Sequence, residues 1–189
     1  MMFTRERPVD QVADAALMRR ASAGDASAYR VVFERHVDAI RGYAISRVGR
    51  DDADDIVSET FATAWRTSGR FDSTATSVAP WLYGIATNGI AKHRDREQRW
   101  INQPHRDHGR EGQTEHEPTA FEIDPALAHA ISKLSPPLRD TLLLTALADF
   151  SVAETGRALG ISATTARVRL LRARRQARHH LEGERHDQP

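Results

Sequence analysis

The sequence predicts an all-α protein with two small helical domains joined by a flexible linker. Apolar residues recur at helical spacing in both halves of the 189-residue chain, and no useful length alternates like a strand. Glycine and proline interrupt this pattern where helices end and begin. Residues 102–118 contain almost nothing apolar, so burial there cannot offset the entropy of ordering. The predicted boundaries are 9–100 for the first domain, 101–123 for the linker, 124–182 for the second domain and 183–189 for a disordered tail.

The first half predicts four helices that bury one core together. Gly24 and Gly49 lie where the first and second helices end, and Asp25 can cap the second. Asp51 and Asp52 supply an N-cap and first-turn negative charge for the third helix. The helices are expected over 9–23, 26–48, 51–65 and 78–100, and the third has the most regular apolar stripe, formed by Ala53, Ile56, Val57, Thr60, Phe61, Ala64 and Trp65.

The second half predicts three or four short helices. Asp124-Pro125 and Ser135-Pro136-Pro137 mark helix starts, because proline suits the first turn. Ser151 and Glu154 form a capping box for a helix that ends at Gly160. A capped helix, a tight glycine turn and a second helix form the signature of a helix-turn-helix. The residues expected to pack inward are Leu138, Leu142, Leu143, Leu147 and Ile161.

The last helix, which Ser162 can cap, divides into two sectors. At about 100° per residue, its small apolar residues fall together in one narrow sector: Ala166, Leu170, Ala173 and Ala177. A helix that enters the major groove needs this division, because arginine and threonine on the opposite sector can then reach base edges. Further arginines would hold phosphates. The residues expected at DNA are Thr164, Thr165, Arg167, Val168, Arg169, Arg172 and Arg175.

Charge and composition narrow the class of protein. The net charge is only +1, but acids gather at 51–55 and 111–124 and arginines gather near the C-terminal end, which indicates two partners of different charge. The chain has no cysteine, and its first residues lack the apolar core of a signal peptide. We therefore expect a cytoplasmic protein without membrane insertion, cofactor or metal. Three histidines, His105, His108 and His116, are interpreted as solvated, because nothing in the linker fixes a metal-binding geometry.

Both halves resemble the extracytoplasmic-function sigma factors of bacterial RNA polymerase. In the second half the similar segments are Leu134-Ser135-Pro136-Pro137, Leu159-Gly160-Ile161-Ser162 and Arg172-Ala173-Arg174. In the first half they are residues 51–61 through Trp65, and Trp81-Leu82-Tyr83-Gly84-Ile85-Ala86 with Asn88. The two halves follow one another in the order that the family has. The resemblance implies a promoter-specific initiation factor and not an enzyme.

The resemblance also implies a role for each segment. The third helix would dock on the clamp coiled coil of the largest polymerase subunit, and the polymerase contacts would include the flap of the second-largest subunit. The fourth helix and the loop before it would capture the melted minus-ten strand, and the helix-turn-helix would recognise the minus-thirty-five duplex. An anti-sigma factor is implied as a further partner. The polymerase-binding residues would be Asp54, Asp55, Ser58 and Glu59, and the minus-ten residues Ser73, Thr74, Ser77, Trp81, Asn88, Lys92, Arg94 and Arg96.

Two alternatives stay open at this point. Asp51, Asp52 and Asp55 also fit the aspartate-rich pattern with which prenyl-diphosphate enzymes hold magnesium, although no second metal motif accompanies it. The other alternative is a stand-alone helix-turn-helix regulator that never contacts polymerase.

The chain departs from the sigma pattern at Thr155 and Ala166, where larger aliphatic residues are usual, and at Ser58, where glutamine is usual.

Overall fold

The computed structural model describes residues 13–75, 77–101 and 124–186, and within these residues the chain is helical without strands. The predicted all-α class is confirmed. Each helix in these ranges is too short or too polar to cross a lipid bilayer. The predicted linker from residue 102 on, and residues 9–12 of the predicted first helix, lie outside the described residues. The first unit contains α1 (Asp14–Ser22), α2 (Ala26–Val48), α3 (Arg50–Arg66), the 3-10 turn η2 (Ser68–Arg70) and α4 (Ala79–Ile101), and the second contains α5 (Pro125–Ser132), α6 (Pro136–Ala146), α7 (Val152–Leu159) and α8 (Ala163–His186).

Local capping sets the helix boundaries of the first unit. The Asp25 carboxylate accepts hydrogen bonds from the backbone N–H groups of Ser27 and Ala28, so its predicted role as the cap of α2 is confirmed. Gly49 ends α2 with a φ of 85°, a conformation that favours glycine. The predicted cap of α3 is wrong in one respect. Gly49 itself precedes the helix, no side chain caps it, and Asp51 and Asp52 lie in its first turn.

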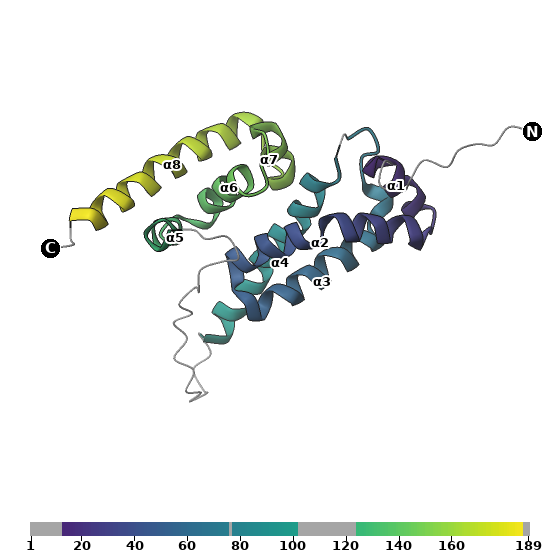
Figure 1. Cartoon of the computed structure of the whole chain (residues 1–189), viewed down its shortest axis with the longest axis horizontal. Helices are drawn as coiled ribbons and strands as arrows, with labels where there is room; N and C mark the ends of the chain where they lie inside the picture. Colours follow the sequence, from purple (N-terminus) through teal and green to yellow (C-terminus); the bar gives the residue numbers. More distant parts are fainter. Residues whose placement is uncertain (1–12, 76, 102–123, 187–189) are drawn as a thin grey trace, which may run out of the picture.

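The core of the first unit lies between α2, α3 and α4, and α1 covers one end of it (Figure 1). Every predicted residue of the α3 stripe is buried except Trp65, whose side chain is 36% exposed. Its ring lies 5.0 Å from the ring of Tyr29 on the surface between α2 and α3. The largest apolar side chains buried in this core include Leu17, Met18, Ile40, Tyr43, Ile56, Leu82 and Ile90.

The second unit has the predicted helix-turn-helix. Both hydrogen bonds of the Ser151–Glu154 capping box are present at the start of α7. Gly160 ends that helix in the left-handed conformation with a φ of 63°. The Ser162 hydroxyl then accepts a hydrogen bond from the Thr165 backbone N–H at 3.1 Å, as expected for the cap of α8. In α6, Leu143 and Leu144 are buried, whereas Leu138, Leu142 and Leu147 are only partly so, and Leu144 was not predicted.

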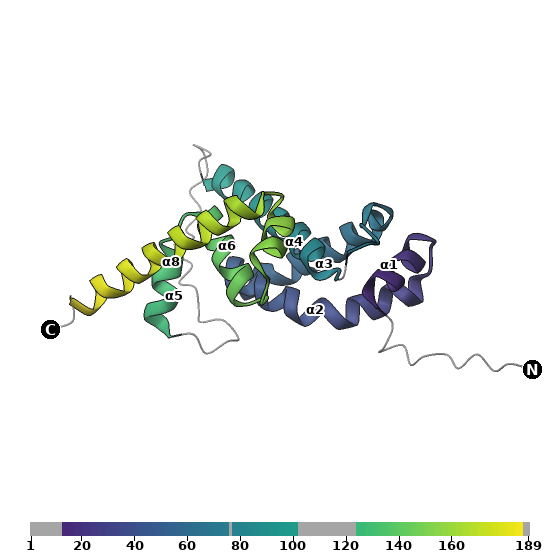
Figure 2. The same ribbon diagram turned by 90° about the horizontal axis from the view of Figure 1, so that it is seen from above.

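The two units lie against one another. Helix α7 packs on α4, and the second unit runs beside α2 and α4 in both views (Figures 1 and 2). Leu144 and Phe150 join the apolar cluster of the first unit, and the Phe150 ring meets the Tyr83 ring edge-on at a centroid distance of 5.1 Å. A smaller cluster around Leu134, Ala173 and Ala177 lies wholly within the second unit. The sequence predicted two domains but not this contact.

The capping box gives a testable prediction. Ser151→Ala removes the acceptor for the Glu154 backbone N–H, so the free energy of unfolding should fall by about 1 kcal/mol. Ser135→Ala is the matched control, since Ser135 precedes α6 without a side-chain capping bond and should change stability by less than about 0.5 kcal/mol. Chemical denaturation followed by circular dichroism measures both variants. Equal losses would mean that the capping bond does not form in solution.

Candidate functional site

Helix α8 presents an outward face of polar and basic side chains. The predicted inner residues Ala166, Leu170, Ala173 and Ala177 are at most 6% exposed, which confirms that sector. The predicted outward residues are exposed, apart from Arg169, which is half-buried: Thr164, Thr165, Arg167, Val168, Arg172 and Arg175. Leu171, which was not predicted, is 63% exposed on the same side. Because Leu171 lies three residues after Val168, helical spacing places it on the outward sector. It was not predicted there because leucine more often belongs to a core.

Helix α7 packs on α6 through a small and partly polar contact, and on the turn before α8 through Gly156. Thr155 is fully buried, and its hydroxyl lies 3.4 Å from the Thr145 hydroxyl, which in turn donates to the backbone carbonyl of Thr141. A hydroxyl pair therefore occupies the place where a larger aliphatic residue was expected. Gly156 lies so close to the turn that an added Cβ would come within 2.9 Å of the Ile161 carbonyl oxygen.

Helix α3 presents an acidic face on the side away from its buried stripe. Asp54, Asp55, Ser58 and Glu59 are all exposed. Asp54 forms an ion pair with Arg41 at 3.1 Å, and Glu59 lies 3.9 Å from Arg96 of α4. Asp55 has no ion-pair partner in the part of the chain that the structure describes. The structure therefore brings the four predicted polymerase-binding residues together on one surface.

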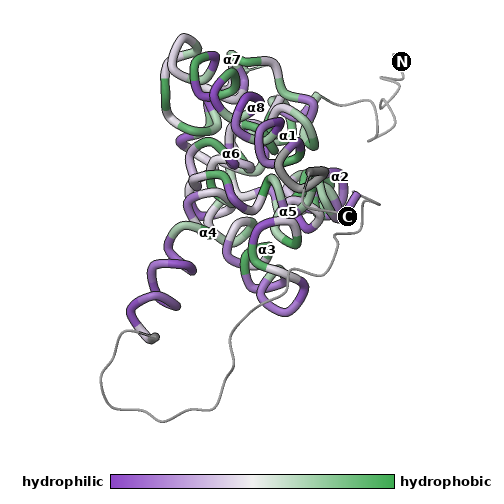
Figure 3. The backbone as a smooth tube through the Cα atoms, turned by 90° about the vertical axis from the view of Figure 1, so that its left-hand side faces the viewer, coloured by the Kyte–Doolittle hydropathy of each residue, from purple (hydrophilic) through white to green (hydrophobic). Residues whose placement is uncertain are grey.

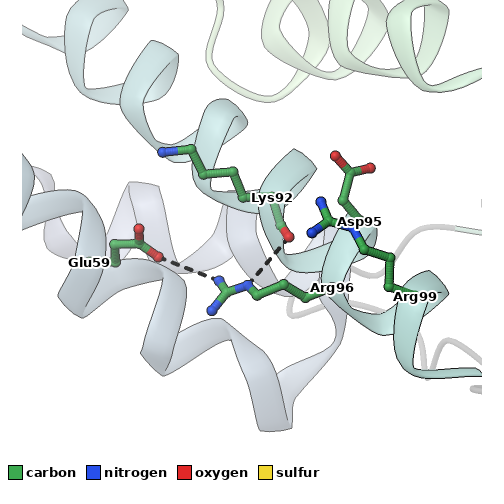
Figure 4. A pocket seen from close by; sticks show the side chains of 5 residues that line it. All are labelled: Glu59, Lys92, Asp95, Arg96 and Arg99. Carbon is green, nitrogen blue, oxygen red and sulfur yellow. Dashed lines mark hydrogen bonds and ion pairs between the residues drawn. The ribbon is translucent and has the colours of Figure 1, made fainter. Parts of the chain in front are cut away.

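A shallow cleft of about 360 Å³ lies between α3 and α4. Figure 4 shows Arg96 reaching from α4 toward Glu59, while its Nε donates to the Lys92 carbonyl oxygen at 3.4 Å. The last turns of α4 are strongly hydrophilic (Figure 3). The cleft thus places candidate polymerase-binding and minus-ten residues side by side, with bases in excess, and it is lined by Glu59, Lys92, Asp95, Arg96 and Arg99.

The loop before α4 holds three of the other minus-ten candidates. Ser73 and Thr74 are exposed, and the Thr74 hydroxyl and backbone N–H donate to the Asp72 carboxylate, which lowers the pKa of Asp72. The Ser77 hydroxyl accepts a hydrogen bond from the Ala79 backbone N–H at the start of α4. Further along α4, the half-buried ring of Trp81 lies 5.5 Å from that of Phe71, while Asn88 and Lys92 are exposed.

Arg94 is placed differently from the other basic candidates. Its guanidinium donates to the backbone carbonyl of Arg47 at 2.6 Å, and burial lowers the pKa of Arg94. The side chain is therefore directed into the junction of the two units and away from the outer surface of α4. The sequence grouped Arg94 with Lys92 and Arg96 because all three belong to one basic run, and spacing alone did not show that Arg94 has a partner on α2.

One cluster of potential metal ligands occurs among the described residues. Ligand atoms of Asp52, His93 and Glu97 lie within 4.8 Å of one another, and the His93 Nε2 is 3.4 Å from Asp52 and 3.7 Å from Glu97. This arrangement suits ion pairs that join α3 to α4 when the imidazole is protonated. The histidines of the predicted linker, His105, His108 and His116, lie outside the described residues.

Both units of this chain are similar to regions of known proteins. The family model for sigma-70 region 2 matches residues 32–100, and the model for sigma-70 region 4 matches residues 125–176. The RNA polymerase sigma factor NccH of Alcaligenes xylosoxydans xylosoxydans is 32% identical over 177 residues, which cover 87% of this chain and 92% of that relative. The ECF RNA polymerase sigma factor BldN of Streptomyces coelicolor is 32% identical over 149 residues, which cover 76% of this chain and 56% of the relative. The chain belongs to the extracytoplasmic-function sigma factors.

Solved structures agree with this fold. CnrH, in complex with the cytosolic domain of CnrY, matches this sigma factor with a TM-score of 0.67 and 24% identity, covering 91% of this chain and 99% of CnrH. RpoE of Bartonella quintana, in complex with the anti-sigma factor NepR, matches with a TM-score of 0.64 and 21% identity over 82% of this chain and 96% of RpoE.

The alternative of a stand-alone helix-turn-helix regulator is wrong, because the first unit itself matches sigma-70 region 2. The protein directs promoter-specific transcription initiation by RNA polymerase.

On α4, Arg96 faces the outer cleft and Arg94 faces inward, and this difference gives a prediction. Arg96→Ala should weaken capture of single-stranded promoter DNA by the holoenzyme and lower its salt slope by about 0.7, since one phosphate contact is lost. Arg94→Ala should leave that slope unchanged and lower the melting temperature, because Arg94 bonds the Arg47 carbonyl. Fluorescence anisotropy at several salt concentrations and a thermal melt measure the two effects. A slope lowered equally by Arg94→Ala would contradict the inward placement.

Proposed function

We propose that this sigma factor divides its work between three exposed surfaces. The acidic face of α3 docks on core polymerase, α4 and its preceding loop capture the melted minus-ten strand, and the outer face of α8 recognises the minus-thirty-five duplex. The observation that supports this most is the division of α8, in which small buried residues alternate with exposed threonine and arginine after a capped glycine turn. A major-groove helix requires that division.

The polymerase contact follows from the charge and exposure of α3. Asp55 and Glu59 are one helical turn apart and exposed, while Ile56 and Val57 are buried, so the acids can meet a basic partner without disturbing the core. By the family resemblance this partner is the clamp coiled coil of the largest subunit, and the second unit would contact the flap of the second-largest subunit. Asp54 and Ser58 complete the surface, with Ser58 in place of the usual glutamine.

The minus-ten contact would use the loop and α4 together. By the family resemblance, Ser73, Thr74 and Ser77 would hold a flipped base, and Trp81, partly exposed on the first turn of α4, offers an aromatic surface. Asn88 can contact a base, and Lys92 and Arg96 can follow the phosphate backbone along the cleft. Arg94, which donates to the Arg47 carbonyl on α2, lies apart from this track.

The minus-thirty-five contact divides into base and phosphate contacts. Thr164, Thr165 and Val168 lie in the first turns of α8, where recognition helices approach base edges, and Val168 can meet a thymine methyl. Arg172 follows one turn later on the same side. Arg167, Arg169 and Arg175 would hold phosphates and set the position of the helix in the groove.

We also propose an anti-sigma partner, a domain division and a non-enzymatic role. RpoE of Bartonella quintana binds the anti-sigma factor NepR, which supports a partner of the same kind here. The proposed domains are 9–100 and 124–182, with a linker over 101–123 and a tail over 183–189. The gap between the two family matches, which end at 100 and resume at 125, supports the position of the linker. Membership of a transcription-factor family favours a structural role for Asp51 and Asp52 in the first turn of α3, and docking by Asp55, over magnesium chemistry.

The docking surface is tested by charge reversal. Asp55→Arg with Glu59→Arg should abolish co-purification with core polymerase and keep the helical circular dichroism, because both side chains lie off the buried stripe. Glu34→Arg with Asp38→Arg makes the same charge change at the same spacing on α2, where both acids are also exposed, and should retain binding. Normal binding by the α3 variant would show that α3 does not dock on polymerase.

The recognition helix is tested by two arginines. Arg172→Ala should remove a base contact at a cost of about 1–3 kcal/mol and relax specificity at one position. Arg175→Ala should weaken every duplex alike and lower the salt slope by about 1, as loss of a phosphate contact does. Competition binding over a panel of minus-thirty-five variants separates the two. Swapped effects would mean a different rotation of α8 in the groove, and no effect from either would contradict DNA recognition by α8.

A further inference from the structure

Three side chains that can bind a metal ion converge where the first turn of α3 meets α4. Asp52 belongs to that first turn, and His93 and Glu97 lie one helical turn apart on α4. Helices α3 and α4 pack against one another (Figures 1 and 2). The ligand atoms, one from each side chain, all lie within 4.8 Å of one another. Packing of the two helices therefore brings one imidazole and two carboxylates to a single point.

The ion pairs of His93 leave its ring nitrogen unsatisfied. The side chain is only 18% exposed, and its Nε2 atom is buried and forms no hydrogen bond with any residue that the structure describes. This nitrogen lies 3.4 Å from an Asp52 oxygen and 3.7 Å from a Glu97 oxygen. A charge-assisted N–H···O bond is shorter, at about 2.7–2.9 Å. A buried nitrogen without a partner is unfavourable, and a cation between it and the carboxylates would satisfy it.

The spacing of the three side chains fits a bound ion better than direct hydrogen bonds. Zn²⁺ binds histidine nitrogen and carboxylate oxygen at about 2.0–2.2 Å with tetrahedral geometry. Two ligands on such a tetrahedron lie about 3.4 Å apart. The distance from His93 Nε2 to the Asp52 oxygen has this value, and the distance to the Glu97 oxygen is only slightly longer. The Glu97 side chain is 57% exposed, so it has room to adjust.

The charges of the cluster also favour a divalent cation. Two carboxylates carry two negative charges, and a protonated imidazole returns only one. Among the described residues, Asp52 and Glu97 form ion pairs with His93 alone. Arg94 lies close enough to Glu97 for their charges to interact, but its guanidinium donates to the Arg47 carbonyl. A divalent ion bound to two carboxylates and a neutral imidazole leaves the site without net charge.

The ligand types select a transition metal. Mg²⁺ and Ca²⁺ take oxygen ligands, whereas imidazole suits zinc, copper, iron and nickel. One nitrogen and two oxygens therefore fit an ion of the zinc type. Asp52 and Glu97 are 40% and 57% exposed, so the fourth position of a tetrahedral site would open to solvent and can be filled by water.

We propose that Asp52, His93 and Glu97 form a binding site for one divalent transition-metal ion of the zinc type, completed by water. The ion would join the first turn of α3 to α4 and so fix the helix that carries the acidic face. We expected no metal from the sequence, because Asp52 and His93 are distant along the chain and the interpreted histidines lay in the linker. This site goes beyond the proposed function and does not depend on it.

Titration of the full-length, tag-free protein with Zn²⁺, followed by calorimetry after removal of bound metal with a chelator, tests the site. His93→Ala should lower the affinity for Zn²⁺ by more than about tenfold, since loss of a ligand costs at least as much as loss of a residue that orients one. Glu97→Gln should act in the same direction, and its exposed position protects the fold. His179→Ala is the matched control, because it removes an exposed histidine of α8 and should leave the affinity unchanged.

Thermal stability provides a second readout. At about a hundredfold excess over its dissociation constant, Zn²⁺ should raise the Tm of the wild type and of His179→Ala by about 5 °C. The same concentration should leave His93→Ala and Glu97→Gln unchanged. Circular dichroism without metal checks that the variants fold, and Glu97→Gln decides the outcome if His93→Ala does not.

Two results would overturn the site. One is an equal affinity for Zn²⁺ in the wild type, His93→Ala and Glu97→Gln, and the other is a loss of affinity in His179→Ala alone, because either would place the ion elsewhere in the chain. None of these measurements uses polymerase or DNA, so their failure would leave the proposed function untouched.

Discussion

The guanidinium of Arg47 is the point on which the arrangement of the two units depends. A charge that is almost fully removed from water needs a partner, and Asp140, 93 positions along the chain, supplies it. The backbone carbonyl of Arg47 accepts a hydrogen bond from the Arg94 guanidinium. Helices α2, α4 and α6 therefore meet at Arg47. Removal of either partner would leave a buried charge uncompensated. The second unit has only a small cluster of its own around Leu134, and Leu144 and Phe150 are buried with the first unit.

Features that depend on neighbours along the chain could be predicted from the sequence. The Asp25 and Ser151 caps, the glycine turn at Gly160 and the buried sector of α8 each involve residues within about one or two helical turns of one another. Spacing is sufficient for such features, because helix geometry fixes which side chains share a face. The outward position of the α3 acids follows in the same way from the burial of Ile56 and Val57. The family followed from two such local patterns in the right order.

Features that depend on distant partners could not be predicted. Arg94 has the same spacing and charge as its neighbours, and only the position of the Arg47 carbonyl turns it inward. Trp65 continues an apolar stripe, yet it lies at the edge of the core and packs on Tyr29 from outside. Leu144 is buried because α6 packs against the first unit, a contact of which the sequence gives no sign. In the sequence Gly84 is an ordinary helical glycine, and only the structure shows that the backbone of Ala158 lies too close to it for a side chain.

Arginine has opposite consequences in the two units because burial, and not residue type, decides what its charge does. On α8, Arg172 and Arg175 keep their hydration in the free protein, so exchanging water for phosphate or a base edge releases counterions and favours binding. At the junction, three arginines have already exchanged much of their hydration for partners within the protein. Arg47 pairs with Asp140, Arg94 donates to the Arg47 carbonyl, and Arg139 donates to backbone carbonyls at the end of α5. Their hydrogen bonds therefore join helices of the protein to one another and are not available to DNA. A chain with net charge near zero can in this way hold one set of arginines ready for DNA and use another set to join its own helices.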